Sequence, residues 1–392
     1  MILRKLAGPL RDLARLYPVV KVTGPRQSGK TTLCRATFPD KAYVSLEPLD
    51  ERDFAETDPR GFLRLYADGA VIDEVQRAPG LLTYLQADVD DRPEPGRFIL
   101  TGSQHFGLTA AIAQSLAGRT GVLHLLPLSL DEVRRFAAPP TDLFGTLWAG
   151  GYPRIFDQGI PPDRWLADYI TTYIQRDVRQ VVNVGDLHAF TTFVRLCAGR
   201  TAQEVNLSAL GADAGVSHAT ARVWLSVLET SFICFRLPAW HRNLGKRLRK
   251  TAKLHFFDSG LVCHLLGIRT AEQLVHHPLR GAVFETWVAS EIYKAGAHAG
   301  LEPTLFHLRE DRGAEIDLVL ETGDHLLLVE AKSGATIAPD ALRSLNVVAE
   351  RLAASAVTGR VGRRLIYGGD TSQERSQAEV VSWSDIQARS WT

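Results

Sequence analysis

The sequence is poor in cysteine and has no long apolar run. Its four cysteines, Cys34, Cys197, Cys234 and Cys263, are far apart, which argues against a CxxC-type metal site and a disulfide framework. We interpret them as buried free thiols in a reducing compartment. No run of about eighteen apolar residues is present, so no membrane-spanning helix is expected. The first residues also lack the apolar core of a signal peptide, so we expect a cytoplasmic protein without a membrane partner.

The chain also lacks an excess of charge of either sign. It has 45 lysines and arginines against 44 acidic residues, a formal net charge of +1. A chain balanced in this way does not attract nucleic acid over its whole surface, so any such contact must be local. At 392 residues the chain is too long for one ordinary core, and about two or three domains are expected.

A glycine-rich loop follows an apolar run near the start of the chain. The run ends at Gly24, and Gly29, Lys30 and Thr31 follow at the spacing G-x-x-x-x-G-K-T of a phosphate-binding loop. Glycines let successive backbone N–H groups point at one anion, and a helix beginning near Lys30 adds its positive dipole end. Lys30 can then reach the β- and γ-phosphates, and the Thr31 hydroxyl can bind Mg²⁺. We therefore predict ATP and Mg²⁺ as ligands; the alternative is a glycine turn before an ordinary helix. The predicted nucleotide-binding residues of the loop are Gly24, Pro25, Arg26, Gln27, Ser28, Gly29, Lys30, Thr31 and Thr32.

Short β-rich runs alternate with helical stretches in the first third of the chain. This alternation predicts an α/β fold with a parallel sheet and crossover helices. Asp73 and Glu74 close one of these runs, over residues 70–75. Asp73 would hold Mg²⁺, mostly through water, and Glu74 would polarise the attacking water. The alternative is a solvated pair of carboxylates at the end of a strand.

Two further polar positions are candidates for catalysis. Ser103 and Gln104 follow the strand expected over 98–102, at the edge where open α/β sheets bind ligands, so one of them could sense the γ-phosphate. A polar loop after a strand is the alternative. Arg119 lies between a helix and the next strand, from where its guanidinium could neutralise charge on the γ-phosphate of a neighbouring subunit. Its alternative is a surface arginine.

Taken together, these motifs resemble those of a family of prokaryotic AAA-type ATPases with a C-terminal domain of unknown function. The residues that carry the resemblance are 24–32, 71–76, 100–103 and 116–119. The resemblance covers nearly the whole chain. It implies ATP binding by a P-loop AAA-type core, and with Arg119 it suggests a homo-oligomer. It implies little about biological role.

The middle of the chain is expected to hold a helical lid and a winged helix. Tyr152 and Pro153 resemble an element of related ATPases that packs against the nucleotide, so contact with adenine is predicted; a structural turn is the alternative. Helix is expected over 165–182, with Tyr169, Tyr173 and Ile174 as its core. Residues 206–217 followed by a helix over 218–228 then predict a helix-turn-helix.

A basic cluster follows on what is expected to be the hairpin wing. Its residues predicted to contact DNA are Arg242, Lys246, Arg247, Arg249, Lys250 and Lys253. So dense a cluster in a balanced chain can neutralise backbone phosphates. A solvated face or a protein contact is the alternative. Asp258, within a Phe-x-Asp-x-Gly-Leu element that matches the family, is expected to cap a helix.

The last third contains a set of residues suited to phosphodiester cleavage. Glu285 lies on a helix expected over 281–293, and Asp317 lies on a strand expected over 314–320. Glu330 and Lys332 are two apart on a strand expected over 326–332, so both point to one face. The carboxylates would hold Mg²⁺ and the lysine would orient water or steady phosphate charge. The set resembles the Glu…Asp…Glu-x-Lys signature of restriction-endonuclease-type nucleases, a fold that can also serve binding alone.

The predicted organisation has four parts. They are an AAA-type P-loop ATPase core over 1–135, a helical lid over 136–198, a winged-helix domain over 199–268 and a restriction-endonuclease-like α/β domain over 269–392. The leading interpretation is an ATPase that couples nucleotide turnover to binding, remodelling or processing of DNA, including branched DNA. The alternative is a nucleotide-dependent switch that binds a protein partner and carries an inactive nuclease-like domain.

Overall fold

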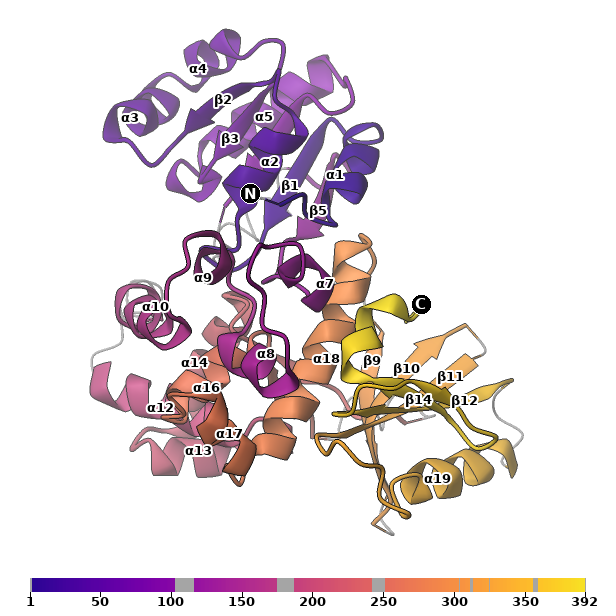
Figure 1. Ribbon diagram of the computed structural model, residues 1–392. Coiled ribbons are helices and arrows are strands. Elements are labelled where there is room, and N and C mark those ends of the chain that lie inside the picture. The colour runs from indigo at the N-terminus through magenta and orange to yellow at the C-terminus, as the bar shows by residue number, and fades with distance from the viewer. Residues whose placement is uncertain are drawn as a thin grey trace. The chain divides into compact units, whose positions relative to one another are not determined.

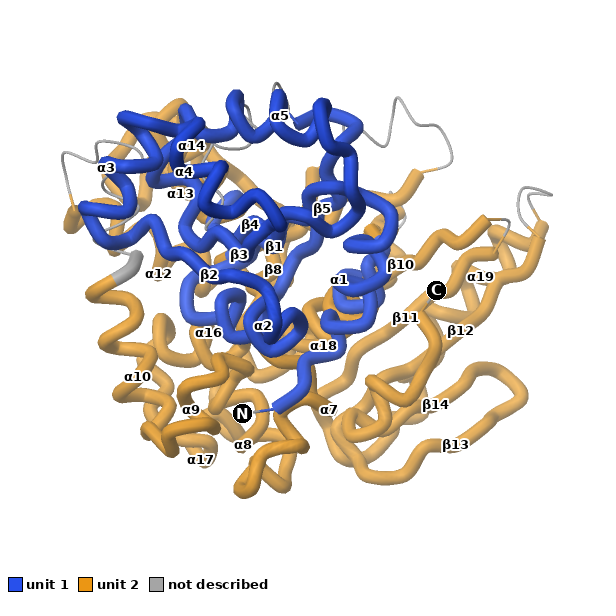
Figure 2. Tube along the Cα trace, turned by 90° about the horizontal axis from the view of Figure 1, so that it is seen from above, with its two compact units in different colours: residues 1–127, 230–232, 297–301 blue, residues 128–229, 233–296, 302–392 orange. Residues whose placement is uncertain are grey.

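The computed structural model divides into two compact units (Figure 2). It describes residues 2–102, 116–174, 187–241, 251–302, 304–310, 313–323, 325–354 and 359–391. The first unit comprises Met1–Pro127, Thr230–Phe232 and Ala297–Leu301, and the second comprises Leu128–Glu229, Ile233–Gly296 and Glu302–Thr392.

The first unit is built on a parallel sheet of five strands in the order β2-β3-β4-β1-β5 (Figure 1). Its strands are β1 (Val19–Thr23), β2 (Ala42–Ser45), β3 (Ala70–Asp73), β4 (Phe98–Thr101) and β5 (Thr120–His124). The helices are α1 (Ala7–Ala14), α2 (Lys30–Thr37), α3 (Leu49–Thr57), α4 (Pro59–Leu65), α5 (Leu81–Asp91) and the 3₁₀ turn η1 (Val75–Arg77). The predicted α/β class and parallel sheet are confirmed.

Apolar residues of β1 contribute to two separate cores. Val20 and Val22 pack in one core with Leu33 of α2, whereas Val19 packs in the other with Phe62 of α4. Side chains alternate between the two faces of a strand, so the two cores lie on opposite faces of the sheet. A parallel sheet covered on both faces explains why its strands read as nearly continuous apolar runs in the sequence.

The second unit begins with helices and a small antiparallel sheet. The helices are α7 (Leu130–Val133), α8 (Leu143–Ala149), α9 (Pro153–Asp157), α10 (Pro162–Tyr169), η2 (Ile170–Ile174), α12 (Leu187–Gly199), α13 (Leu207–Asp213) and α14 (His218–Thr230). The sheet has the order β6-β8-β7, with β6 (Gln203–Glu204), β7 (Cys234–Leu237) and β8 (Lys253–Phe256). The side chain of Asn206 accepts a hydrogen bond from the Ala209 backbone and caps α13, while the Ser217 hydroxyl accepts one from Thr220 at the start of α14. Of the helix expected over 165–182, the part beyond Ile174 lies outside the described residues.

A mixed sheet of six strands forms the rest of the second unit, in the order β13-β14-β12-β11-β10-β9. The strands are β9 (Leu305–Arg309), β10 (Glu315–Thr322), β11 (His325–Lys332), β12 (Val361–Tyr367), β13 (Gln373–Glu374) and β14 (Glu379–Ser382). The helices of this part are α16 (Ser259–Leu265), α17 (Ala271–His276), α18 (Arg280–His298), α19 (Arg343–Ala354) and the 3₁₀ helix η3 (Trp383–Ala388). Leu345 and Val348 of α19 pack against Ile316 and Leu328 of the sheet. The helix predicted around Glu285 is present as α18, and the strands predicted around Asp317 and Glu330 are present as β10 and β11.

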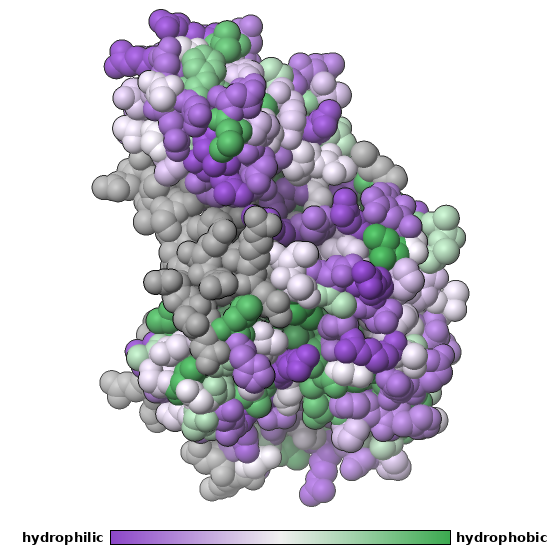
Figure 3. Space-filling model, turned by 90° about the vertical axis from the view of Figure 1, so that its left-hand side faces the viewer, coloured by the Kyte–Doolittle hydropathy of each residue, from purple (hydrophilic) through white to green (hydrophobic). Residues whose placement is uncertain are grey.

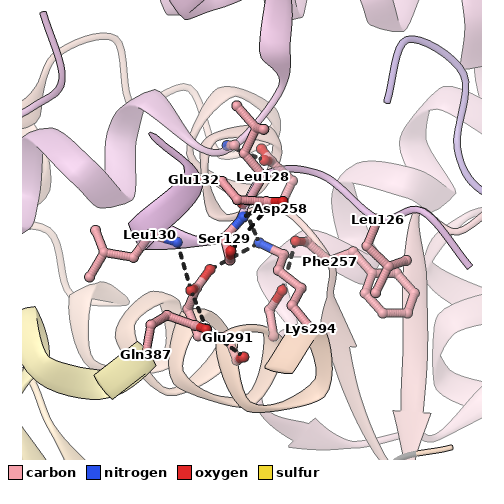
Figure 4. A network of polar contacts seen from close by, with 12 residues as sticks. Leu126, Leu128, Ser129, Leu130, Glu132, Phe257, Asp258, Glu291, Lys294 and Gln387 are labelled. Atoms are coloured by element: carbon pink, nitrogen blue, oxygen red, sulfur yellow. Dashed lines mark hydrogen bonds and ion pairs between the residues drawn. The ribbon is translucent and has the colours of Figure 1, made fainter. Parts of the chain in front are cut away.

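A buried polar network joins distant stretches of the second unit (Figure 4). Glu291 of α18 accepts hydrogen bonds from the Leu130 backbone at 2.9 Å and from the Gln387 amide at 2.8 Å. Lys294, one turn further on, donates to Glu291 at 3.1 Å. Asp258 caps α16, as predicted, by accepting from the Leu261 backbone at 2.8 Å. Glu291 and Lys294 are both buried, so removal of either side chain would leave the other charge without this partner and destabilise the fold.

On the face drawn in Figure 3, hydrophobic residues lie among hydrophilic ones. All four cysteines are buried and free, as expected. Within the described residues, no helix is long and apolar enough to cross a bilayer.

Candidate functional site

The glycine-rich loop connects β1 to α2. Gly29 precedes the first residue of α2 with a φ of 92°, in the left-handed region that glycine tolerates. A Cβ on Gly24 would lie 2.1 Å from the carbonyl oxygen of Leu125, so only glycine allows the backbone after β1 to approach the backbone after β5 this closely. The loop therefore ends at the amino terminus of a helix, where backbone N–H groups bind anions.

The side chain of Lys30 folds back onto this loop. Its Nζ donates hydrogen bonds to the carbonyl oxygens of Gly24 at 3.0 Å and Pro25 at 2.8 Å. Burial lowers the pKa of Lys30 to about 8, against the opposing effect of the Glu74 and Asp73 carboxylates. Neutral carbonyls are weaker partners for an ammonium than phosphate oxygens, so a triphosphate could replace them.

Asp73, the last residue of β3, receives three hydroxyl groups. Its Oδ2 accepts from the Thr31 hydroxyl at 2.9 Å and from the Tyr43 hydroxyl at 3.0 Å, and its Oδ1 accepts from the Thr101 hydroxyl. The loop threonine and the strand-end aspartate predicted to share Mg²⁺ are thus in direct contact. Sequence reasoning missed Tyr43 and Thr101. Thr101 could have been found, because it ends β4, which lies beside β3 in a parallel sheet.

Glu74 has an unusual backbone conformation. Its φ of 57° lies in the left-handed region, which a residue with a Cβ seldom adopts. Its carboxylate accepts a hydrogen bond from the side-chain amide of Gln76. Strain of this kind often marks functional positions, and here it accompanies a carboxylate at the ligand-binding edge of the sheet.

Arg4 ties the loop to the chain that follows β5. Its guanidinium donates to the carbonyl oxygen of Ser28 at 2.7 Å and to that of Leu126 at 2.8 Å, and its side chain is buried. No motif in the sequence indicated this role, because the contact joins residues far apart in the chain. Arg4 is a positioning residue for the loop, since it holds the backbone rather than a ligand.

The acidic residues predicted to form a nuclease site meet in the second unit. Asp317 on β10 accepts a hydrogen bond from the backbone N–H of Ala331 at 2.9 Å, and Lys332 donates to Glu330 at 2.7 Å on β11. Burial, followed by the charge of Asp317, raises the pKa of both Glu285 and Glu330 well above the ordinary range. Among the described residues, no group of three or more histidine, cysteine or acidic side chains is arranged to hold a metal ion.

A second lysine occupies this acidic cluster. Nζ of Lys253, the first residue of β8, lies 3.0 Å from Oε1 of Glu285, 2.7 Å from Oε1 of Glu315 and 4.0 Å from Oδ1 of Asp317. Burial opposes the charge on Lys253, but the nearby carboxylates raise its pKa above the ordinary value. The place of Glu315 in this cluster could have been predicted from the sequence, because Glu315 lies two residues before Asp317 on one strand and the two side chains therefore share a face.

Comparison with known proteins shows which family the chain belongs to. Residues 17–134 match an AAA domain, residues 140–272 a domain of unknown function (DUF8612) and residues 280–386 another domain of unknown function (DUF4143). Uncharacterised proteins of Mycobacterium bovis and Mycobacterium tuberculosis are each 32% identical over 352 residues, or 87% of this chain and 76% of the relative. The chain belongs to this family of AAA-type P-loop ATPases. Among solved structures, the chain is similar to a Walker-type ATPase of Pyrococcus abyssi, with 14% identity and a TM-score of 0.46. The similarity covers 67% of this chain and 94% of that chain.

The AAA domain implies nucleotide binding, typically with Mg²⁺, and the loop residues fit such a ligand. The buried Lys30 ammonium has neutral carbonyl partners, and the Thr31 hydroxyl lies beside the Asp73 carboxylate. Of the other predicted residues, Thr32 is exposed and Arg26 is half-buried. Ser103 and Gln104 lie outside the described residues.

Arg119 lies away from the phosphate loop of its own chain. It directly precedes β5, and its backbone pairs with Val19 at the start of β1. The strands are parallel, so Arg119 is at the amino edge of the sheet, whereas the loop follows the carboxyl end of β1. Its guanidinium donates to Asp90, with Nη2 and Oδ2 2.9 Å apart. An action on the nucleotide of a neighbouring subunit stays a prediction.

Two of the predicted roles are wrong. Tyr152 does not offer its ring to adenine, because the residue is 1% exposed and its ring contacts those of Trp165 and Tyr169, which stack on each other. Its hydroxyl donates to that of Tyr169 at 3.1 Å. The structural-turn alternative therefore describes Tyr152, and Pro153 begins α9.

Lys253 cannot contact DNA phosphates, because its side chain is 3% exposed and its ammonium is directed at carboxylates. The other predicted DNA contacts, Arg242, Lys246, Arg247, Arg249 and Lys250, lie outside the described residues.

Arg4 provides a test of how the loop is held. Arg4→Ala is expected to raise the ATP concentration for half-maximal turnover by about tenfold, because the two charge-assisted hydrogen bonds that tie the loop at Ser28 to the chain at Leu126 are lost. Steady-state turnover against ATP concentration measures the effect, with thermal unfolding as a check on folding. Arg11→Ala, an exposed arginine on α1, is the matched control. Equal behaviour of the two variants would contradict a positioning role for Arg4.

Proposed function

We propose that this chain hydrolyses ATP with Mg²⁺ and couples the turnover to binding or processing of DNA. The observation that carries the ATPase part is the meeting of Lys30, Thr31 and Asp73 at the end of a parallel sheet. A phosphate-binding lysine beside a hydroxyl and carboxylate pair is the arrangement that ATP hydrolysis with a metal requires.

Each residue has a distinct task in this proposal. The loop backbone and Lys30 bind the phosphates and neutralise the charge that develops on them. Thr31 and Asp73 are the residues that would hold Mg²⁺, which supplies further neutralisation of phosphate charge when bound. Glu74 accepts a proton from, or orients, the attacking water, and Gln76 fixes the direction of its carboxylate.

The middle of the chain supports the DNA part of the proposal. The capped helices α13 and α14, followed by the antiparallel β7 and β8, have the order of a winged helix. The exposed positions at the start of α14 include His218 and Arg222, so this helix offers little positive charge. The stronger positive charge lies in the sequence between β7 and β8, at residues 242–250. Phosphate contacts from such a segment would bind DNA without regard to its sequence.

The test of this function is ATP turnover with and without single-stranded, duplex and branched DNA, at two salt concentrations. We expect at least one DNA structure to change turnover several-fold, and we expect the effect to weaken at the higher salt, because phosphate contacts release counterions. Turnover that no DNA changes at either salt concentration would contradict the coupling to DNA.

The basic segment can be tested by charge removal. Replacing Lys246, Arg247, Arg249 and Lys250 by alanine is expected to weaken DNA binding and to flatten its dependence on salt, by up to about 4 in the logarithmic slope. DNA affinity measured over a salt series gives both quantities. The matched control removes four exposed arginines of the first unit, Arg11, Arg15, Arg60 and Arg64. An unchanged slope in the first variant would instead favour contact with a protein.

A second candidate function is a nucleotide-dependent switch that binds a protein partner. The observation that favours it is the position of Lys253, because a lysine seated among the carboxylates leaves the nuclease-like domain without an arranged metal site among the described residues. ATP turnover that responds to no DNA, together with intact DNA substrates, would support this function over the first.

A further inference from the structure

The acidic cluster of the second unit contains a cation that belongs to the protein itself. Glu285 comes from α18, Glu315 and Asp317 from β10, and Glu330 from β11. Lys253 comes from β8 of the small antiparallel sheet, in the stretch that matches a different domain from the carboxylates. The lysine therefore reaches the cluster from outside the domain that supplies it.

The contacts of Lys253 are those of a counter-ion. An ammonium has three N–H donors, and those of Lys253 lie at hydrogen-bond distance from Glu285 and Glu315, with Asp317 at 4.0 Å. Its side chain is 3% exposed, whereas that of Lys332, the lysine of the predicted signature, is 48% exposed and forms an ion pair with Glu330. The two lysines thus differ in role, since one is enclosed by several carboxylates and the other lies at the edge.

Converging carboxylates repel one another unless a positive charge lies among them. That charge can be an ammonium or a divalent cation, but the two repel each other and compete for the same oxygen atoms. We propose that Lys253 is a built-in blocking cation, which keeps the acidic cluster free of metal and whose removal turns the cluster into a divalent-cation site. The proposal deepens the DNA-processing function above and rests on it for the meaning of the cluster, because a metal there could assist phosphodiester cleavage.

The experiment uses Mn²⁺ as the probe and full-length protein without nucleotide. Bound Mn²⁺ is counted by electron paramagnetic resonance in the wild type and in Lys253→Met, which keeps most of the side-chain volume but removes the charge. We expect the variant to bind one additional Mn²⁺ per chain, at least about tenfold more tightly than any site in the wild type, because its carboxylates lack compensation. Mn²⁺ should also raise the unfolding temperature of the variant more than that of the wild type.

A second variant keeps the proposal testable if Lys253→Met does not fold. Lys253→Met combined with Glu315→Gln removes one charge of each sign and leaves Glu285, Asp317 and Glu330 for the cation; it too should gain the Mn²⁺. Lys332→Met is the matched control and should gain none. Equal Mn²⁺ binding by the wild type and both Lys253 variants would overturn the proposal, as would Mn²⁺ in the wild type that Glu330→Gln removes.

These outcomes are separate from those of the proposed function. If DNA has no effect on wild-type ATP turnover while the Lys253 variants gain Mn²⁺, the DNA coupling fails and the blocking role stands. If DNA stimulates turnover while the variants bind Mn²⁺ as the wild type does, the blocking role fails and the coupling stands. Mg²⁺-dependent cleavage of DNA by the Lys253 variants, absent from the wild type, is the further result expected when both hold.

Discussion

Replacing Lys30 by alanine is expected to lower ATP turnover by at least about a hundredfold. The ammonium is the positive charge that the loop directs at the β- and γ-phosphates, where charge develops in the transition state. It is buried, and its Nζ is held by the carbonyl oxygens of Gly24 and Pro25. Phosphate release at saturating ATP and Mg²⁺ measures the loss.

The control for this variant is Lys41→Ala. Lys41 directly precedes β2 and donates to the Arg97 carbonyl at 3.3 Å, so it lies at the amino edge of the sheet, opposite the phosphate loop. This variant should keep turnover near that of the wild type. Full turnover in Lys30→Ala would contradict the assignment of the loop to ATP.

Glu74→Gln is expected to separate binding from hydrolysis. The amide cannot take a proton from the attacking water, so turnover should fall by about a hundredfold or more. Binding of ATP should be retained or strengthened, because one negative charge near the γ-phosphate is removed. Phosphate release and ATP affinity, measured on the same preparation, test the two expectations together.

Glu94→Gln is the matched control for Glu74→Gln. Glu94 is an exposed carboxylate that precedes β4 and pairs with Arg92, away from the carboxyl edge of the sheet. Its replacement should change neither quantity. Wild-type turnover in Glu74→Gln would exclude Glu74 as the residue that activates water, whereas loss of ATP binding would make it a structural residue of the loop.

The parts of the site that could be predicted are those encoded by local spacing. The positions of Gly24, Gly29, Lys30 and Thr31 follow from one strand-loop-helix unit, and Asp73 follows from the end of a second apolar strand. Parallel strands bring their carboxyl ends to one edge, so these residues had to meet. The observed contact between Thr31 and Asp73 joins residues 42 positions apart in the chain.

The residues that could not be predicted depend on tertiary contacts. Arg4 donates to the loop carbonyl of Ser28, 24 positions away, and to the carbonyl of Leu126, 122 positions away, and no local pattern encodes these contacts. Lys253 follows a basic stretch and reads as part of it, but the pairing of β8 with β7 buries its side chain beside α18 and β10. Tyr152 reads as an exposed aromatic after two glycines, whereas it is buried in contact with Trp165 and Tyr169. In each case burial, rather than residue type, decides the role.

The most direct test of the ATPase assignment is a single-turnover measurement, with purified wild-type chain in excess over ATP. This design needs neither DNA nor a known oligomeric state. We predict that ATP is converted to ADP when Mg²⁺ is present, that it stays intact when Mg²⁺ is chelated, and that its conversion is slower by about a hundredfold or more when Glu74 is replaced by glutamine. ATP that remains intact with the wild-type chain and Mg²⁺, or that is converted equally by Glu74→Gln, would contradict the assignment.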